Sequence, residues 1–163
     1  MYQRNEVENR VSLYREYIKE LRQYAPDWLD EENDPIWEKT TIEYLSDPFS
    51  DWIPICADEK EVGFFIVCKR GGDCHPDAEY TISQAYIQKK YRRRGLMANA
   101  VVSYILNHTK GIYCYDVLKG NVSADDFWRI LFTEKVRSTR VYLPEVRGKM
   151  ERKYLNLYGY RVI

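Results

Sequence analysis

YIQKKYRRRGLMANAVVSYI, residues 86–105, joins two kinds of local structure through a short basic stretch. The apolar residues before this stretch fit a β-strand, and the apolar residues after Gly95 repeat about every 3.6 positions, as they do on one face of an α-helix. Five basic residues and one glycine lie between the two patterns: Lys89, Lys90, Arg92, Arg93, Arg94 and Gly95. The stretch therefore predicts a strand, a tight basic turn and a helix, in that order.

A turn of this kind is suited to binding an anion. A strand that leads directly into a helix points several backbone N–H groups at one place, and the helix dipole favours negative charge there. Glycine permits a positive φ and a close approach of the backbone. Arginine side chains add charge-assisted hydrogen bonds, worth roughly 1.5–3 kcal/mol each. A diphosphate fits such a turn, and the alternative from these residues alone is a solvated basic turn.

The overall charge excludes a broadly basic protein. The chain has 163 residues, with 25 basic and 25 acidic side chains and a formal net charge of +0. This length predicts one domain, residues 1–163, with a substantial core. Because nonspecific nucleic-acid binding depends on neutralising many phosphates, a nucleic-acid module built on residues 89–95 is the weakest alternative, and we expect no nucleic-acid partner.

Cysteine spacing and hydropathy point to a reduced, cytoplasmic protein. The N-terminus has no apolar stretch of signal-peptide length, and no segment is apolar enough to span a bilayer, so we expect no membrane partner. The four cysteines are irregularly spaced and form no C-x-x-C pair, so we expect no metal site. Cys56 and Cys68 lie in apolar runs and are predicted to be buried thiols.

The remaining periodicities predict a mixed α/β (α+β) domain. Residues 8–24 form an amphipathic pattern that Pro26 ends, and Pro48 stops a second short helix. A further helix, opened by Ser123, is expected over residues 123–132. The strand-like segments are 52–58, 61–70, 78–88, 112–118, 138–146 and 153–163. In the third of these segments, strict alternation places Tyr80, Ile82 and Gln84 on one face.

The basic turn resembles a known motif. AYIQKKYRRRGLM, residues 85–97, is similar to the acyl-coenzyme A cradle of the GNAT superfamily of N-acetyltransferases. In that family an apolar strand end precedes a Tyr-Arg pair and an Arg/Gln-x-x-Gly-x-Gly/Ala loop that opens a helix. Ile87 matches the strand end, Tyr91 and Arg92 match the pair, and Arg92, Gly95 and Met97 match the loop.

Two downstream segments extend the resemblance to the end of the chain. GNVSADDFWRILF, residues 120–132, resembles the family's Asn-x-x-Ala-x-x-Phe-Tyr segment through Asn121, Ala124 and Phe127. YLNLYGYRV, residues 154–162, resembles the family's closing strand. The two motifs stand in the family's order and at its spacing, so the resemblance covers residues from about 52 to 163, and the predicted N-terminal helices fit the same order.

The resemblance implies a fold, a cofactor and an activity. The fold is a central mixed, splayed β-sheet flanked by helices, in which the strands at 79–88 and 112–118 part to admit the acyl-pantetheine arm. The cofactor is acetyl-coenzyme A, and the activity is direct transfer of the acetyl or acyl group to a primary amine of a small molecule or peptide. The cofactor-binding residues implied are Ile87, Lys89, Arg92, Arg93, Arg94, Gly95, Leu96, Met97, Ala98, Asn121, Phe127 and Trp128.

Two residues depart from the family pattern. Met97 replaces a small residue of the loop, and its side chain would crowd the diphosphate if it turned toward the anion. Trp128 stands where the family often has a tyrosine that protonates the leaving thiolate, and an indole N–H cannot serve as that acid. This second departure keeps open the alternative of a noncatalytic acyl-coenzyme A-binding or regulatory protein.

The residues that deprotonate and attract the amine are less well defined. Glu79 is the candidate general base, because some family members carry a glutamate on the strand that leads to the cradle, and an exposed acid beside a turn is its other interpretation. His75 and His108 are weaker candidates. An acidic loop between the first two helices either attracts a cationic acceptor or is a solvated surface loop: Asp30, Glu31, Glu32 and Asp34. The apolar C-terminal strands make a homodimer possible.

Overall fold

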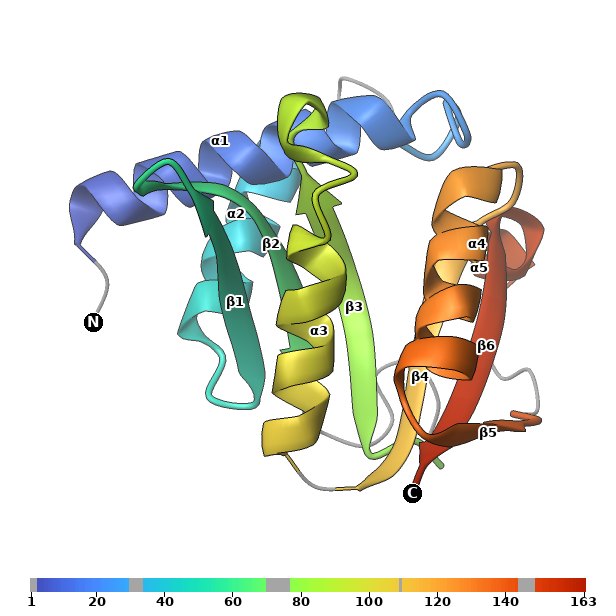
Figure 1. Ribbon diagram of the computed structural model, residues 1–163. Helices are drawn as coiled ribbons and strands as arrows, with labels where there is room; N and C mark the ends of the chain where they lie inside the picture. Colours follow the sequence, from blue (N-terminus) through green and yellow to red (C-terminus); the bar gives the residue numbers. More distant parts are fainter. Residues whose placement is uncertain (1–2, 30–33, 70–76, 109, 144–148) are drawn as a thin grey trace.

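The structure is a computed structural model that describes residues 3–29, 34–69, 77–108, 110–143 and 149–163. Its helices and strands follow the predicted order, with two helices ahead of the first strand, except that one short helix precedes the last strand (Figure 1). In chain order the elements are α1 (Arg4–Leu21), α2 (Asp34–Ser46), β1 (Ser50–Ala57), β2 (Lys60–Cys68), β3 (Tyr80–Ile87), the 3₁₀ turn η2 (Lys89–Tyr91), α3 (Leu96–Asn107), β4 (Gly111–Leu118), α4 (Val122–Ile130), the π-helical turn η3 (Leu131–Lys135), β5 (Ser138–Val141), α5 (Lys149–Tyr154) and β6 (Leu155–Val162).

The strands form one mixed sheet, which confirms the predicted fold class. Their spatial order is β1-β2-β3-β4-β6-β5. Every neighbouring pair is antiparallel except β3 and β4, which run parallel in the middle of the sheet. A parallel pair needs a crossover, and α3 provides it between these two strands. The basic turn therefore lies at the start of the crossover helix.

Helices cover both faces of the sheet (Figure 1). On one face, Leu13, Tyr14 and Ile18 of α1 pack with Trp52 and Phe64, and side chains of α2 join them. The α1 side chains that do so recur at helical spacing, as the amphipathic pattern predicts. On the other face, α3 and α4 pack over a larger apolar cluster that includes side chains of β2, β3, β4 and β6.

The sheet splits between β3 and β4, as the resemblance implies. These strands are paired only where Tyr80–Ile82 lies beside Tyr113–Tyr115, and Figure 1 shows them diverging beyond that point. The pairing of β3 with β2 shifts register at the same place: Val67 is opposite Ile82 and Ile66 is opposite Gln84, which leaves Ser83 as an extra residue. Such a bulge bends a strand and increases its twist, so it accounts locally for the split.

The bulge also corrects the predicted face of Gln84. Strict alternation groups Gln84 with Tyr80 and Ile82, but the extra residue at Ser83 reverses the pattern. Tyr80 and Ile82 belong to the cluster under α3 and α4. Gln84, in contrast, makes hydrogen bonds to tyrosines of α1 and α2 on the opposite face.

Several element boundaries differ from the sequence prediction. The fourth helix begins at Val122, because Asn121 rather than Ser123 is its N-cap and accepts a hydrogen bond from the Ala124 N–H at 3.3 Å. Residues 149–154, partly predicted as strand, form the short helix α5. Cys68 is buried as predicted, but Cys56 is exposed because it alternates with buried Ile55 on the edge strand β1.

Candidate active site

The turn before α3 has the geometry of an anion-binding site. Arg93 has φ of 63° and Gly95, the N-cap of α3, has φ of 75° and ψ of 7°. The first backbone bond of the helix runs from the Asn99 N–H to the Gly95 carbonyl at 2.9 Å. The N–H groups of the preceding helical residues, 96–98, consequently have no carbonyl acceptor within the helix. They point outward at the positive end of the helix dipole, where an anion is favoured.

A cavity of about 600 Å³ opens beside these N–H groups. It lies between the end of β3, the N-terminus of α3, the first turns of α4 and one side of α1. Among the residues that line it are all but one of those that the resemblance implies for the cofactor: Ile87, Lys89, Arg92, Arg93, Gly95, Leu96, Met97, Ala98, Asn121, Phe127 and Trp128. The structure thus brings together residues from two motifs that lie more than twenty positions apart in sequence.

The basic side chains of the turn have different roles. Arg92 forms a bidentate pair with Glu20 of α1, with N–O distances of 2.9 and 2.7 Å, and also donates to the Ile87 carbonyl at 2.7 Å. The hydrogen bonds to Glu20 raise the pKa of Arg92. Since this pair neutralises its own charge, Arg92 fixes the turn against α1. Lys89 and Arg93 are exposed and line the cavity, so they place positive charge at its rim.

Arg94 is the exception among the implied cofactor residues. It does not line the cavity, and its guanidinium lies 5.3 Å from the ring centroid of buried Tyr91. Lys90 approaches the same ring at 5.1 Å. A cation over an aromatic face is attracted by the ring quadrupole, so these two side chains have a favourable position away from the cavity. Direct contact of Arg94 with the phosphates is therefore not supported by this geometry.

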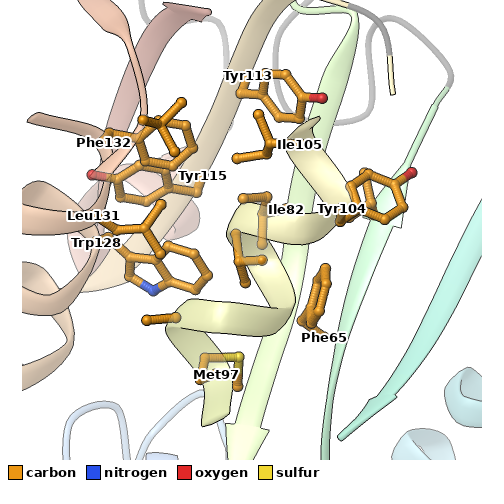
Figure 2. Packing of buried hydrophobic residues seen from close by; sticks show 14 of the residues in the cluster. Phe65, Ile82, Met97, Tyr104, Ile105, Tyr113, Tyr115, Trp128, Leu131 and Phe132 are labelled. Atoms are coloured by element: carbon orange, nitrogen blue, oxygen red, sulfur yellow. The ribbon is translucent and has the colours of Figure 1, made fainter. Parts of the chain in front are cut away.

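Both residues that depart from the family pattern are buried in the core (Figure 2). Met97 is 9% exposed and packs in the cluster under α3, so its side chain leaves the space before its N–H group open. Trp128 is 7% exposed and packs against Tyr115, with ring centroids 5.5 Å apart. Trp128 therefore forms part of the cavity wall and supplies no acidic hydroxyl there.

A second cavity, of about 220 Å³, lies at the split itself. Residues 82–85 of β3 and 115–118 of β4 form two of its sides; these segments begin at the last paired residues and continue beyond the point where the strands part. Its other walls are largely aromatic and come from α1, the segment after it and α2: Tyr14, Tyr17, Trp28 and Trp37. The two cavities share Tyr17, Leu21, Ala85, Asn121, Ala124 and Trp128 in their linings, so they adjoin each other at the split.

The smaller cavity holds polar residues that sequence reasoning missed. The Tyr17 hydroxyl donates to Gln84 Oε1 at 2.7 Å, and Gln84 Nε2 donates to the Tyr44 hydroxyl at 3.5 Å. Burial raises the pKa of Tyr17, and nearby Tyr44 and the Asp116 carboxylate raise it further. Asp116 had a sequence signal, because it is the one charged residue in the apolar strand segment 112–118. Gln84 had none, since its position depends on the bulge.

The structure does not bring Glu79, the predicted general base, to either cavity. Its carboxylate accepts a hydrogen bond from the Ile112 N–H and lies against Gly111, at the paired end of β3 and β4. This is the lower end of the sheet in Figure 1, away from the turn that precedes α3. Glu79 therefore closes the end of the parallel pair, and its predicted role as base gains no support from this position.

The described structure places none of the other residues predicted for the acceptor site at either cavity. His108 is exposed at the C-terminus of α3, where Nδ1 lies 2.8 Å from the Tyr104 carbonyl and the ring stacks on Tyr104, so it is not near the cavities. The predicted acceptor-attracting acids Asp30, Glu31 and Glu32, and the histidine at 75, lie outside the described residues; the side chain of Asp34 does so too.

The described part of the chain contains no group of three or more His, Cys, Asp or Glu side chains placed to hold a metal ion. None of its helices has both the length and the apolar character that a membrane span requires.

Sequence comparisons and structure comparisons give different results. No protein-family model and no curated protein matches the chain by sequence. By structure, an acetyltransferase of the GNAT family from Streptococcus agalactiae superposes with a TM-score of 0.73 at 16% identity, over 100% of this chain and 93% of that one. An acetyltransferase from Thermus thermophilus gives a TM-score of 0.60 at 15% identity, over 94% and 92% of the two chains.

A third solved structure contains a bound ligand. The PaiA N-acetyltransferase of Thermoplasma acidophilum, determined in complex with coenzyme A, gives a TM-score of 0.58 at 12% identity, over 96% of this chain and 93% of that one. At such identities the likeness establishes the fold. The chain has the fold of the GNAT acetyltransferases, a mixed sheet split at its central parallel pair, as the resemblance in sequence predicts.

Proposed function

We propose that the protein is an N-acetyltransferase that transfers an acetyl group from acetyl-coenzyme A to a primary amine. The observation that carries this proposal is the pair of adjoining cavities at the split in the sheet. One end presents an anion-binding helix N-terminus, and the other presents a carboxylate and hydroxyl groups. A two-substrate transfer needs two such ends that meet, and the likeness to GNAT structures supports the same assignment.

The larger cavity fits the nucleotide end of coenzyme A. Backbone N–H groups of residues 96–98 would bind the diphosphate, with Lys89 and Arg93 adding positive charge at the rim. Beyond the bulge at Ser83, the edge of β3 that faces β4 has no ladder partner in the described chain. Apart from the Ile87 carbonyl, which accepts from Arg92, and the Ala85 backbone, which hydrogen-bonds Tyr17, the backbone groups of this edge would hold an extended pantetheine arm. The split in the sheet would then have a function.

The smaller cavity fits the acceptor amine. When bound, acetyl-coenzyme A supplies the acetyl group as a thioester, so that an N–C bond forms and the C–S bond breaks. Asp116 would accept one proton from the ammonium group, which leaves a neutral amine able to attack. A second proton leaves the nitrogen after attack and balances the charge of the departing thiolate. Backbone N–H groups of β3 beside the bulge would stabilise the oxyanion.

A noncatalytic acyl-coenzyme A-binding protein is the second candidate, and Trp128 favours it. This indole is buried in the cavity wall at the position where the family often has a hydroxyl acid. Its N–H cannot protonate a thiolate at neutral pH. Because a thiolate is a tolerable leaving group, loss of the acid slows transfer without preventing it. Turnover therefore decides between the two candidates.

Calorimetric titration of acetyl-coenzyme A into the purified protein tests the cofactor, with an oligonucleotide as the control ligand. We expect one-to-one binding of acetyl-coenzyme A in the micromolar range and no binding of the oligonucleotide. Thiol release in the presence of a panel of primary amines then tests transfer. Absence of cofactor binding refutes the transferase, whereas cofactor binding without thiol release across the panel favours the noncatalytic protein.

A further inference from the structure

We infer that the acceptor is a primary arylalkylamine: a compact molecule with one ammonium group, an aromatic ring and no carboxylate. The inference deepens the proposed function, on which it rests, because it names the chemical class that the smaller cavity selects. It draws on the size, the charge and the wall composition of that cavity.

Size restricts the acceptor to a small molecule. The cavity at the split has a volume of about 220 Å³, below the roughly 300–1,000 Å³ of most ligand pockets. It lies beneath α1, with Tyr14, Ile18 and Leu21 of that helix in its wall. Such a space accommodates a single ring with a short alkyl chain. A peptide of several residues would have to extend outside it.

The charge of the described lining favours a monocation. Asp116 is the one carboxylate among the described residues that line the smaller cavity, and no lysine, arginine or histidine is among them. An ammonium group therefore has a counter-charge in Asp116. A substrate carboxylate, in contrast, would enter a small space beside Asp116 with no cation to pair with. A second ammonium, as in a polyamine, would have no second carboxylate among the described lining residues. Amino acids and polyamines are disfavoured for these two reasons.

The walls favour an aromatic body over an aliphatic one. Six of the cavity's lining residues are aromatic: Tyr14, Tyr17, Trp28, Trp37, Tyr115 and Trp128. Flat rings stack on or pack edge-to-face against such walls, and ring faces also attract an ammonium group. Tyr14, which is 1% exposed, and Trp37 each carry a buried polar atom with no hydrogen-bond partner among the described residues. The cavity wall therefore contains two polar groups whose hydrogen-bonding capacity no described residue uses.

The position of Asp116 at the split would place a bound amine close to the cofactor cavity. Asp116 follows Tyr115, the last β4 residue that is paired with β3, so its carboxylate lies at the start of the split. Tyr17, whose pKa the Asp116 charge helps to raise, lines both cavities. An ammonium group held by Asp116 would therefore lie where the two cavities adjoin, with its aromatic body toward the aromatic residues of α1 and α2.

The matched pair phenethylamine and phenylalanine tests the inference, because the two differ only by a carboxylate. Binding of each to the full chain is measured calorimetrically with coenzyme A present, and spermidine is the polycationic probe. We expect phenethylamine to bind at least tenfold more tightly than phenylalanine or spermidine. Equal or tighter binding of either competitor overturns the inference.

An Asp116→Asn variant tests the carboxylate, and Asp126→Asn is its control. Asp126 is exposed, pairs with Arg129 at 3.3 Å and lines neither cavity. We expect Asp116→Asn to raise the Kd of phenethylamine at least tenfold while the Kd of acetyl-coenzyme A changes less than twofold, which also shows that the variant folds. An Asp116→Asn protein with unchanged phenethylamine affinity overturns the role of this carboxylate. Asp126→Asn should leave both constants unchanged.

Thiol release separates failure of the inference from failure of the proposed function. If phenethylamine binds as expected and no thiol is released, the transferase proposal fails while the ligand class stands. If amino acids or polyamines release thiol and phenethylamine does not, the transferase proposal stands and the arylalkylamine is excluded. Thiol release with phenethylamine that exceeds release with phenylalanine at least tenfold supports both.

Discussion

Replacement of Gly95 by glutamate is the sharpest test of the anion site before α3. At φ of 75°, any side chain pays a left-handed backbone cost, about 1–2 kcal/mol. An added Cβ would lie 3.6 Å from Asn99 Nδ2, an ordinary contact, so backbone strain is the main cost to folding. In a chain of this length that strain lowers Tm by about 2–8 °C. The variant should therefore fold.

The effect on coenzyme A binding comes from charge. A carboxylate about 6 Å from one phosphate charge costs about 0.7 kcal/mol at the dielectric constant of water and about 2.8 kcal/mol at an effective value of about 20. These limits correspond to roughly threefold and hundredfold weaker binding for each phosphate charge. Gly95→Gln has the same shape and backbone cost without the charge, so the difference between the two variants isolates the electrostatic contribution.

The assay combines calorimetric titration of acetyl-coenzyme A with thermal unfolding of each variant. Gly120→Ala is the control for backbone strain, because Gly120 has φ of 90°, does not line the larger cavity, and its added Cβ would make only a 3.7 Å contact with Tyr24. We expect the three variants to lose similar stability and only Gly95→Glu to lose most of its affinity. If folded Gly95→Glu and Gly95→Gln bind acetyl-coenzyme A equally well, the turn does not hold the diphosphate.

Three further predictions use other parts of the structure. Arg93→Glu should weaken acetyl-coenzyme A binding at low salt several-fold more than Arg94→Glu, because of these two arginines only Arg93 lines the cavity. The difference should shrink at 0.5 M salt, which screens exposed charges. Equal losses of affinity in calorimetry would contradict this prediction. Trp128→Tyr should lower the free energy of unfolding by about 1–3 kcal/mol, through lost packing on Tyr115, and raise thiol release by restoring a hydroxyl; a fall in turnover would show that the indole shapes the pocket. Burial, aided by nearby Glu16, raises the pKa of Tyr86 to about 12. In the unfolded chain a tyrosine ionises near pH 10. The contribution of Tyr86 to stability is therefore complete below pH 10 and is lost as the pH rises to about 12. Urea unfolding from pH 9 to 12 should show that loss, and Tyr86→Phe should reduce it.

Local sequence patterns were sufficient for most of the fold. Periodicity located the helices and strands to within a few residues, and one glycine after a basic run located the turn before α3. These features are set by neighbours in sequence, so a single chain contains them. The short helix α5 was missed because residues 153–162 alternate well enough to predict one continuous strand.

Long-range packing determined what the sequence could not predict. Arg92 is paired with Glu20, a residue 72 positions away, and no local pattern shows that this arginine is neutralised. The bulge at Ser83 moved Gln84 to the other face of β3 and created the split that Asp116 borders. Glu79 was assigned as base from its strand alone, whereas its distance from the cavities depends on where β3 and β4 part.

The split gives the molecule an internal strand edge, and this has a consequence for its solubility. Strand edges with unpaired backbone groups are templates for pairing with other chains, and proteins normally cover them. Here α1 covers the edge, since Tyr17 and Leu21 line both cavities beside β3. The unpaired backbone groups of β3 can thus face a ligand in the cavities while α1 shields them from neighbouring protein molecules. A chain that loses α1 loses one wall of both cavities and gains an aggregation-prone edge in the same event.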